Sequence, residues 1–435
     1  MKILIISYYY TPAISPRAFR WTTIAEHWAK KGECVEVICS WEPGLARSEI
    51  INGVHIHRIG NIAVKMLRKQ FKNNDSMKIT LNEKEKSKNK LSLFLKWVYD
   101  HTWKKVYWPD FACLWYFAAL KKAKYLLMTG KYDKLITVSI PFTCHMVGLN
   151  IKKRNPDMLW VMDIGDPFYI LDTTPVNNYK MYRRLNYLIE KKIISCADII
   201  SVTTEVLAKI YRNVFPESNK KIYVIPPLIS LSNKSDIEKH IFLKKDMIRF
   251  VFVGTLYKAI RSPKFLLELF RKLLQTSLGD KLEMHFLGKV HDCSDSFELY
   301  KDLLDNKIFI HGLVDHNIAL RAMKEADFLV NIGNDTSYQL PSKLVEYMSS
   351  GKPIINFISS SNDSSLPLIK DFPYHINIID NDITKENDVL LLEDFIKKSI
   401  GKVVNPEKVK QIINPFSEDK IIGQYTKLIY KGGYV

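Results

Sequence analysis

The stretch QLPSKLVEYMSSGKPII at residues 339–355 determines how the second half of the chain is interpreted. It predicts a short helix that begins near Pro341, because a proline fits a first helical turn, where no N–H is needed. Gly351 ends this helix, and an apolar strand follows. The unpaired N–H groups and the positive end of the helix dipole then lie at Ser342 and Lys343. This arrangement predicts a phosphate or diphosphate site.

Glu346 follows one helical turn later, on the same side of the helix as Ser342 and Lys343. A carboxylate in this position is able to accept hydrogen bonds from the hydroxyls of a ribose or a sugar. An anion site beside a hydroxyl-binding acid predicts a pocket for a nucleotide sugar.

The same stretch resembles the donor-site motif of GT-B retaining glycosyltransferases of family 4, also called group 1. In that family a Glu, seven residues and a second Glu precede an Ala/Ser-Gly-Lys/Thr-Pro-Val/Ile run. Glu346 matches the second Glu, residues 348–355 match the run, and Tyr338 replaces the first Glu. One branch has Pro-Ser-Lys-Leu-x-Glu-Tyr followed by Gly-Lys-Pro, which this chain fits closely. The resemblance implies a nucleotide-diphosphate sugar as donor, retention of configuration, and no metal or other cofactor.

Length and composition indicate two ordinary globular domains. The chain has 435 residues, of which 47% are hydrophobic and 25% charged, so two domains of about 200 residues each are expected. Its six cysteines are scattered without metal-ligand spacing, which predicts reduced thiols in the cytoplasm. The N-terminal apolar run is too short for a signal peptide, and the longest uncharged run, at residues 135–151, is too polar to span a membrane.

Strand-like and helix-like patterns alternate along both halves of the chain. Strands are predicted at residues 2–7, 35–40, 55–59, 134–139, 159–163, 199–203 and 221–225, and then at 248–254, 282–288, 307–312, 328–332 and 353–357. Such β-α-β alternation predicts an α/β fold with two Rossmann-like, doubly wound domains facing across a cleft, the GT-B architecture. We expect an N-terminal acceptor-binding domain at 1–230 and a nucleotide-sugar domain at 246–415. A C-terminal helix at 416–435 is expected to pack on the first domain.

No dinucleotide or P-loop motif accompanies these strands. The first strand is followed by Tyr-Tyr-Tyr-Thr-Pro and not by G-x-G-x-x-G, and no Walker A sequence is present. Hydride transfer and P-loop chemistry are therefore not expected.

The turn after the strand at 248–254 supplies further candidate donor ligands. Relatives have Gly-Arg-Leu and then Lys-Gly here, but Thr255 stands in the Arg position. Arg261 falls near the family lysine, with Lys264 and Lys258 close by in sequence. A guanidinium is able to grip two phosphate oxygens at once, so Arg261 and Lys264 are predicted diphosphate ligands. The alternative is that both are surface charges at a helix N-terminus.

In the first domain, His145 and Asp166 are the predicted catalytic residues. Both follow strands, and the resemblance implies that His145 lies near the reacting sugar. Asp166 lies in Asp-Ile-Gly-Asp-Pro-Phe, where it is able to act as a base or orient an acceptor hydroxyl. The alternatives are a buried, hydrogen-bonded histidine and an aspartate that caps its turn. We expect Asp163 to be structural.

Arg17 and Arg20 follow the first strand and are predicted to bind the pyrophosphate of a lipid-linked acceptor. The alternative is that they are solvated charges. A metal site is not expected, because the resemblance implies chemistry without a divalent ion, and His55 and His57 alternate on a strand without a third ligand.

The charge of the chain is uneven. Its net charge is +18, and twelve Lys or Arg residues face four acids between Lys65 and Lys105. Because no nucleic-acid-binding motif is present, an anionic membrane surface is the predicted partner of this insertion, and nucleic acid is not expected. Residues 91–108 resemble an interfacial helix; the alternative is a solvated basic insertion. We expect a cytoplasmic protein that is peripheral on the inner face of the cell membrane.

The sequence thus predicts a glycosyltransferase that moves a sugar to a lipid-linked glycan in surface polysaccharide biosynthesis. A nucleotide-sugar epimerase of the same architecture is one alternative. A non-catalytic binding protein is the other, because Tyr338 and Thr255 depart from the family pattern.

Overall fold

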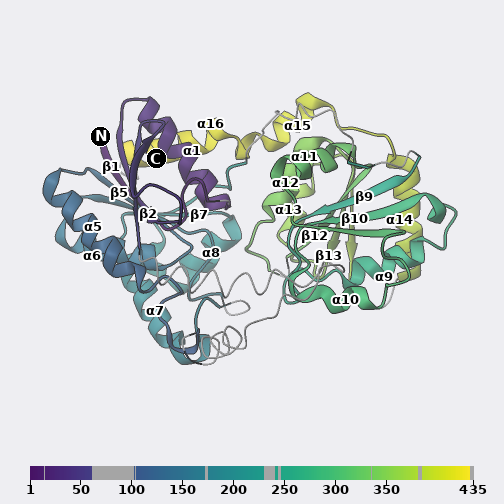
Figure 1. Cartoon of the computed structure of the whole chain (residues 1–435), viewed down its shortest axis with the longest axis horizontal. Coiled ribbons are helices and arrows are strands. Elements are labelled where there is room, and N and C mark those ends of the chain that lie inside the picture. Colours follow the sequence, from purple (N-terminus) through teal and green to yellow (C-terminus); the bar gives the residue numbers. More distant parts are fainter. Residues whose placement is uncertain are drawn as a thin grey trace. The chain divides into compact units, whose positions relative to one another are not determined.

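The chain forms two compact units in a computed structural model. Residues 1–13, 15–60, 102, 104–171, 175–229, 241–242, 246–334, 336–380 and 385–431 are described. The first unit comprises Met1–Leu228 together with the C-terminal segment that starts at Glu418, and the second comprises Ile229–Ser417 (Figure 1).

The first unit is built on an eight-stranded sheet with the order β3-β4-β2-β1-β5-β6-β7-β8. Its strands are β1 (Lys2–Ser7), β2 (Cys34–Ser40), β3 (Ser48–Ile51), β4 (Val54–Ile59), β5 (Lys134–Val138), β6 (Leu159–Asp163), β7 (Ile199–Val202) and β8 (Ile222–Val224). All neighbouring strands are parallel except β3 and β4. The order reverses between β1 and β5, which is where open α/β sheets bind ligands.

Helices cover both faces of this sheet (Figure 1). They are α1 (Pro16–Lys30), α4 (Lys104–Val106), α5 (Trp115–Thr129), α6 (Thr143–Arg154), α7 (Tyr179–Cys196), α8 (Glu205–Val214) and α16 (Glu418–Lys431). α1 and α16 share one apolar core with the sheet, and Trp28 donates a 2.9 Å hydrogen bond to Thr426 between them. The C-terminal helix therefore belongs to the first unit although it follows the second in sequence.

The second unit contains a parallel six-stranded sheet with the order β11-β10-β9-β12-β13-β14. Its strands are β9 (Ile248–Val253), β10 (Leu282–Leu287), β11 (Ile308–Gly312), β12 (Phe328–Ile332), β13 (Ile354–Ile358) and β14 (His375–Ile379). Its helices are α9 (Lys264–Leu273), α10 (Ser294–Glu298), α11 (His316–Glu325), α12 (Ser342–Ser350), α13 (Ser365–Ile369), α14 (Lys385–Ser399) and α15 (Pro406–Ile413). α9 and α14 share one apolar core, and α11, α12 and α15 share another, so the sheet is covered on both faces.

The strands predicted from periodicity are all present, within one or two residues at their ends. The prediction omitted β3, which is a four-residue edge strand with alternating half-buried and exposed residues. It also omitted β14 at the edge of the second sheet. The predicted basic insertion at 65–105 lies outside the described residues, apart from Thr102 and the segment 104–105.

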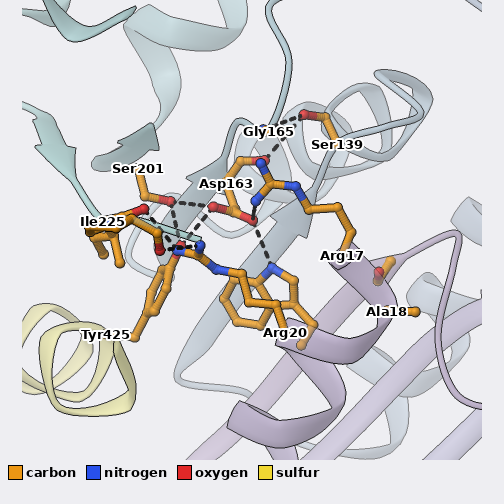
Figure 2. Close-up of polar contacts among 12 residues, drawn as sticks. Arg17, Ala18, Arg20, Ser139, Asp163, Gly165, Ser201, Ile225 and Tyr425 are labelled. Carbon is orange, nitrogen blue, oxygen red and sulfur yellow. Dashed lines mark hydrogen bonds and ion pairs between the residues drawn. The ribbon is translucent and has the colours of Figure 1, made fainter. Parts of the chain in front are cut away.

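A buried carboxylate joins several elements of the first unit. Asp163 lies at the end of β6 and is almost fully buried. Its Oδ2 atom accepts hydrogen bonds from Arg17 Nη1 (3.1 Å) and Trp21 Nε1 (2.8 Å) on α1. Its Oδ1 atom accepts from Ser201 Oγ on β7 (2.8 Å) and from the Tyr425 hydroxyl on α16 (2.7 Å). Figure 2 shows how these donors converge on one carboxyl group.

Arg20 extends the same network. Its guanidinium is buried and donates to the Tyr425 hydroxyl (2.6 Å) and to the carbonyl oxygens of Pro226 (2.7 Å) and Ile225 (3.3 Å). Burial alone raises the pKa of Asp163, but Arg17, Arg20 and the hydrogen-bond donors outweigh it and lower that pKa to about 2. The carboxylate is therefore ionised at neutral pH and anchors α1 and α16 to the sheet.

Replacing Asp163 with Asn should destabilise the first unit strongly, because Arg17 and Arg20 then lose a buried counter-charge. We expect a loss of about 3 kcal/mol at pH 7, measured by urea denaturation. The folded pKa of Asp163 lies below its ordinary 3.8, so its stabilisation is present above pH 3.8 and is lost as the pH falls toward 2. The Asn variant should lack this acid-dependent component.

As a control, Asp157→Asn on the exposed turn before β6 should change stability by less than about 0.5 kcal/mol. Equal losses in the two variants would contradict the anchoring role.

Candidate functional site

The carboxyl ends of β9 and β12 form the switch point of the second sheet, because the strand order reverses between these neighbours. The loop after β9 contains Thr255 and Arg261, and Lys264 is the first residue of α9, the helix that follows. The loop after β12 contains Asn334 and Tyr338 and leads into α12. The parallel sheet therefore brings the residues predicted to bind the donor to one edge of the second unit.

Arg261 bridges the two loops. Its Nη2 atom donates a 2.6 Å hydrogen bond to Asn334 Oδ1, and its Nη1 atom donates a 3.4 Å bond to the carbonyl oxygen of Thr255. Burial lowers the pKa of Arg261, although a guanidinium stays protonated at neutral pH. Both hydrogen-bond acceptors are neutral, and Asp363 adds a favourable charge interaction. A desolvated cation of this kind is suited to bind an anion.

Two glycines allow the strand ends to come close beneath Arg261. A Cβ atom on Gly288 would lie 1.9 Å from the carbonyl oxygen of Gly254, so only glycine fits there. Gly254 itself has a φ of +155°, and a Cβ atom on it would lie 3.5 Å from Arg261 Nη1. The end of β9 is thus shaped to hold the guanidinium against backbone.

Asn334 connects Arg261 to the segment before α12. Its Nδ2 atom donates to the carbonyl oxygen of Gln339 (3.2 Å), which also accepts from Ser364 Oγ (2.5 Å) after β13. Three loops at this sheet edge are therefore linked through one amide side chain and one carbonyl. Sequence reasoning did not identify Asn334, because an asparagine after a strand is also the usual sign of a turn.

α12 begins at Ser342 and ends at Gly351, whose φ of +72° is the left-handed conformation expected of a glycine at a helix end. No side chain in the described part of the chain caps its N-terminus, which leaves the backbone N–H groups of Ser342 and Lys343 without a side-chain cap. Lys343 Nζ pairs with Glu346 Oε2 at 2.6 Å. The predicted helix and the predicted common side of Lys343 and Glu346 are both confirmed.

Tyr347 fixes this helix to the end of β9. Its buried hydroxyl accepts a 2.7 Å hydrogen bond from the N–H of Val253 and donates to the Val253 carbonyl at 3.2 Å. Charge interactions with both Arg261 and Glu346 act on the Tyr347 hydroxyl, so these two predicted donor ligands lie near the same group. Tyr347 is thus a structural residue of the site that the sequence alone did not single out.

The remaining basic residues of the β9 loop differ in their surroundings. Lys264 is exposed at the first residue of α9. The ammonium of Lys258 pairs with Asp295, and its backbone N–H donates to Asp292 Oδ1 at 2.9 Å. Arg261 is therefore held close to the sheet edge, whereas Lys258 is paired with Asp295 in α10 and with Asp292 just before it.

In the first unit, the loops after β5 and β6 also meet. The rings of Phe142 and Phe168 stack with centroids 3.8 Å apart. Asp110 accepts hydrogen bonds from the N–H (2.9 Å) and hydroxyl (2.7 Å) of Thr143, and it also accepts from the N–H of Ala112 (2.8 Å). Asp110 and the segments that follow β5 and β6 thus form one cluster.

His145 is fully buried within this cluster. Its Nδ1 atom lies 2.7 Å from Thr137 Oγ1, and burial lowers its pKa to about 3, so the ring is neutral. Its Nε2 atom has no hydrogen-bond partner among the described residues. A buried neutral imidazole matches the structural alternative for His145. Its contact with a reacting sugar stays a prediction without support from this geometry.

Asp166 is half-buried, and its loop is anchored by Glu190 on α7. Glu190 is buried; its Oε2 atom accepts from the N–H of Tyr169 (2.8 Å) and its Oε1 atom from the hydroxyl of Tyr211 (2.6 Å). Burial raises the pKa of Glu190 to about 7. Sequence reasoning did not identify this role, because Glu190 lies among lysines in an amphipathic helix and resembles a surface charge.

The two predicted acceptor ligands have different environments. Arg17 is partly exposed, pairs with Asp163, and packs so closely on Gly165 that a Cβ atom there would lie 2.1 Å from Arg17 Nη2. Arg20 is buried and hydrogen-bonded within the core. The structure thus gives Arg20 a structural role in place of acceptor binding, since no surface of its guanidinium is left for a ligand.

Among the described residues, no group of three His, Cys, Asp or Glu side chains is arranged to hold a metal ion. Within the same part of the chain, no helix has the length and apolar character needed to cross a membrane.

Comparison with known proteins places this geometry in context. Residues 248–363, which include β9, Arg261 and α12, match the sequence profile of the family described as Glycosyl transferases group 1. No curated protein sequence matches the chain.

Solved structures resemble the whole chain. Sucrose-phosphate synthase from Thermosynechococcus elongatus has a TM-score of 0.64 at 14% identity, covering 99% of this chain and 98% of that one. The catalytic domain of starch synthase IV from Arabidopsis thaliana, bound to ADP and acarbose, has a TM-score of 0.60 at 11% sequence identity. The match covers 99% of this chain and 99% of that one. Anabaena HepE in complex with UDP has a TM-score of 0.58 at 11% sequence identity. The match covers 99% of this chain and 100% of that one. These likenesses confirm the predicted GT-B fold class of two Rossmann-like domains.

The elevated pKa of Glu190 predicts a pH-dependent stability. Its folded pKa of about 7 lies above its ordinary 4.5, so the folded state holds the proton more tightly and stability falls as the pH rises from 4.5 to 7. The drop should be on the order of 3 kcal/mol and should be absent in Glu190→Gln, which stays neutral. Urea denaturation of both proteins between pH 4.5 and 8 measures it. Parallel curves for wild type and variant would contradict the assignment.

Proposed function

We propose that the protein transfers a sugar from a nucleotide-diphosphate sugar to a glycan acceptor. The observation that supports this most directly is the junction of Arg261, the uncapped start of α12 and Glu346 at the switch point of the second sheet. The match of this segment to group 1 glycosyltransferases also supports it. The likeness to structures bound to UDP or ADP supports a nucleotide sugar as the donor.

The donor diphosphate is proposed to bind between Arg261 and the N–H groups of Ser342 and Lys343, with Lys264 contributing from the start of α9. Glu346 is proposed to accept hydrogen bonds from ribose or sugar hydroxyls. Because Lys343 and Glu346 form an ion pair, a bound diphosphate would draw the ammonium toward itself and leave the carboxylate to the hydroxyls.

In this reaction the bond between the anomeric carbon and the phosphate oxygen breaks, and the acceptor oxygen bonds to that carbon. Negative charge grows on the leaving diphosphate, so cations and N–H groups held in advance stabilise the transition state more than the ground state. The acceptor hydroxyl loses its proton to a base, for which Asp166 is the candidate. We propose a retaining reaction without a metal, following the family resemblance.

The proposed acceptor is a lipid-linked glycan of surface polysaccharide biosynthesis, used at the cytoplasmic face of the membrane. Arg17 is the remaining candidate ligand of its pyrophosphate, because its side chain stays partly exposed while it pairs with Asp163. The net charge of +18 supports contact with an anionic surface.

Replacing Arg261 with Ala should weaken binding of nucleoside diphosphates about tenfold to a hundredfold, because charge-assisted hydrogen bonds to phosphate are lost. Calorimetric titration with UDP, GDP and ADP measures the effect on the wild type and the variant. The matched control is Lys258→Ala, which removes a cation from the same loop that is already paired with Asp295. The control should bind within about twofold of wild type. Equal affinity for wild type and Arg261→Ala would contradict the assignment.

The reaction class is tested by incubating the protein with a panel of nucleotide sugars, each with and without a lipid-linked oligosaccharide acceptor. We expect free nucleoside diphosphate and an elongated acceptor only when both substrates are present. An epimerised sugar formed without acceptor would establish the epimerase alternative. Absence of both binding in a thermal-shift screen and hydrolysis across the panel would favour the non-catalytic binding protein.

A further inference from the structure

Helix α5 is apolar on its outer face as well as on its inner face. The inner face is buried and consists of Trp115, Ala119, Ala123 and Leu126. The outer face exposes four large apolar side chains: Leu114 (49%), Phe117 (69%), Tyr125 (59%) and Met128 (86%). Their spacing of three, eight and three residues follows the helical repeat, so they form one stripe. A single exposed apolar residue needs no explanation, but a stripe of four indicates a contact surface.

The charged residues of α5 itself have one sign. Lys121 and Lys124 are exposed within it, and Lys122 lies beside it with its ammonium 5.2 Å from the centre of the Tyr125 ring. The sequence from Phe111 to Tyr132 contains no Asp or Glu. The outer face of α5 therefore combines large apolar groups with basic groups and offers no acid.

We propose that this outer face of α5 docks on an anionic membrane surface. Apolar side chains on such a helix enter the boundary between headgroups and acyl chains, while lysine ammonium groups meet lipid phosphates. Tyr125 has the amphipathic ring that suits this depth. With 15 residues, about 22 Å, α5 is too short to span a bilayer and lies along its surface.

The charge argues for lipid against a second copy of this chain. A symmetric contact through α5 would bring Lys121 and Lys124 of one copy against the same residues of the other, and like charges repel. Anionic headgroups complement these lysines, and the acyl region accepts Phe117 and Met128.

This surface deepens the proposed function, since it brings the first unit to the membrane that holds a lipid-linked acceptor. Its residues are separate from those proposed to bind the donor. Binding of UDP and binding of vesicles can therefore be measured independently on the same protein. Loss of the first alone would count against the transferase proposal, and loss of the second alone would count against membrane docking.

The test is co-sedimentation of the full chain with phosphatidylcholine vesicles, prepared with and without phosphatidylglycerol. One variant replaces Lys121, Lys122 and Lys124 with Ala, and another replaces Phe117 and Met128 with Ser. The matched charge control replaces Lys397, Lys398 and Lys410, each of which pairs with an acid on its own helix in the second unit. The matched apolar control replaces Leu299 and Leu390, which are similarly exposed there.

We expect the wild type to bind vesicles that contain phosphatidylglycerol and not those without it. The lysine variant of α5 should bind about a hundredfold more weakly, because three basic contacts are lost, and the apolar variant should also be weakened. Both controls should bind like the wild type. The proposal is overturned if the wild type does not prefer anionic vesicles, if the α5 variants bind as tightly as wild type, or if the controls weaken equally.

Discussion

The parallel order of the strands is the constraint on which the rest of this molecule depends. In each sheet it brings every strand-to-helix loop to the same edge, and the order reverses at one pair of neighbours, β1 with β5 and β9 with β12. Helix starts with unpaired N–H groups gather at this edge. In the second unit, Arg261 and the start of α12 occur there together, although 80 residues separate them in sequence. The topology therefore assembles the proposed anion site from segments that are distant in the chain.

The buried charges of the two units have different hydrogen-bond partners. In the first, Asp163 is surrounded by donors on α1, β7 and α16, so its ionised form is satisfied internally and its role is structural. In the second, Arg261 has neutral oxygens as hydrogen-bond partners, and its favourable charge interaction with Asp363 is not a hydrogen-bonded ion pair. A satisfied charge stabilises a fold, whereas a desolvated cation with neutral partners favours an incoming anion. This difference is the physical reason for assigning the nucleotide to the second unit.

Much of the fold could be predicted from sequence because buried parallel strands are continuous apolar runs, as in β1 and β9. The start and end of α12 could be predicted because Pro341 and Gly351 have strong positional preferences. The network around Asp163 could not, since Tyr425 is 262 residues away and no local pattern links them.

The same limit explains the predictions of site residues that the structure does not support. Arg20 and His145 follow strands in sequence, as ligands often do. Each lies on the inner face of its helix, so both side chains are buried in the core. The positioning residues Asn334 and Glu190 were missed for the converse reason. In sequence, Asn334 resembles an ordinary turn residue and Glu190 an ordinary surface residue. Only the structure shows that Asn334 bonds Arg261 and that Glu190 bonds the loop after β6.

A crystal structure of the protein with bound UDP tests the central claim most directly. We expect the diphosphate to lie within hydrogen-bond distance of the Arg261 guanidinium and of the N–H groups at Ser342 and Lys343, with Glu346 facing the ribose. A diphosphate bound away from the switch point of β9 and β12, with the Lys343–Glu346 pair and Arg261 unchanged, would contradict it.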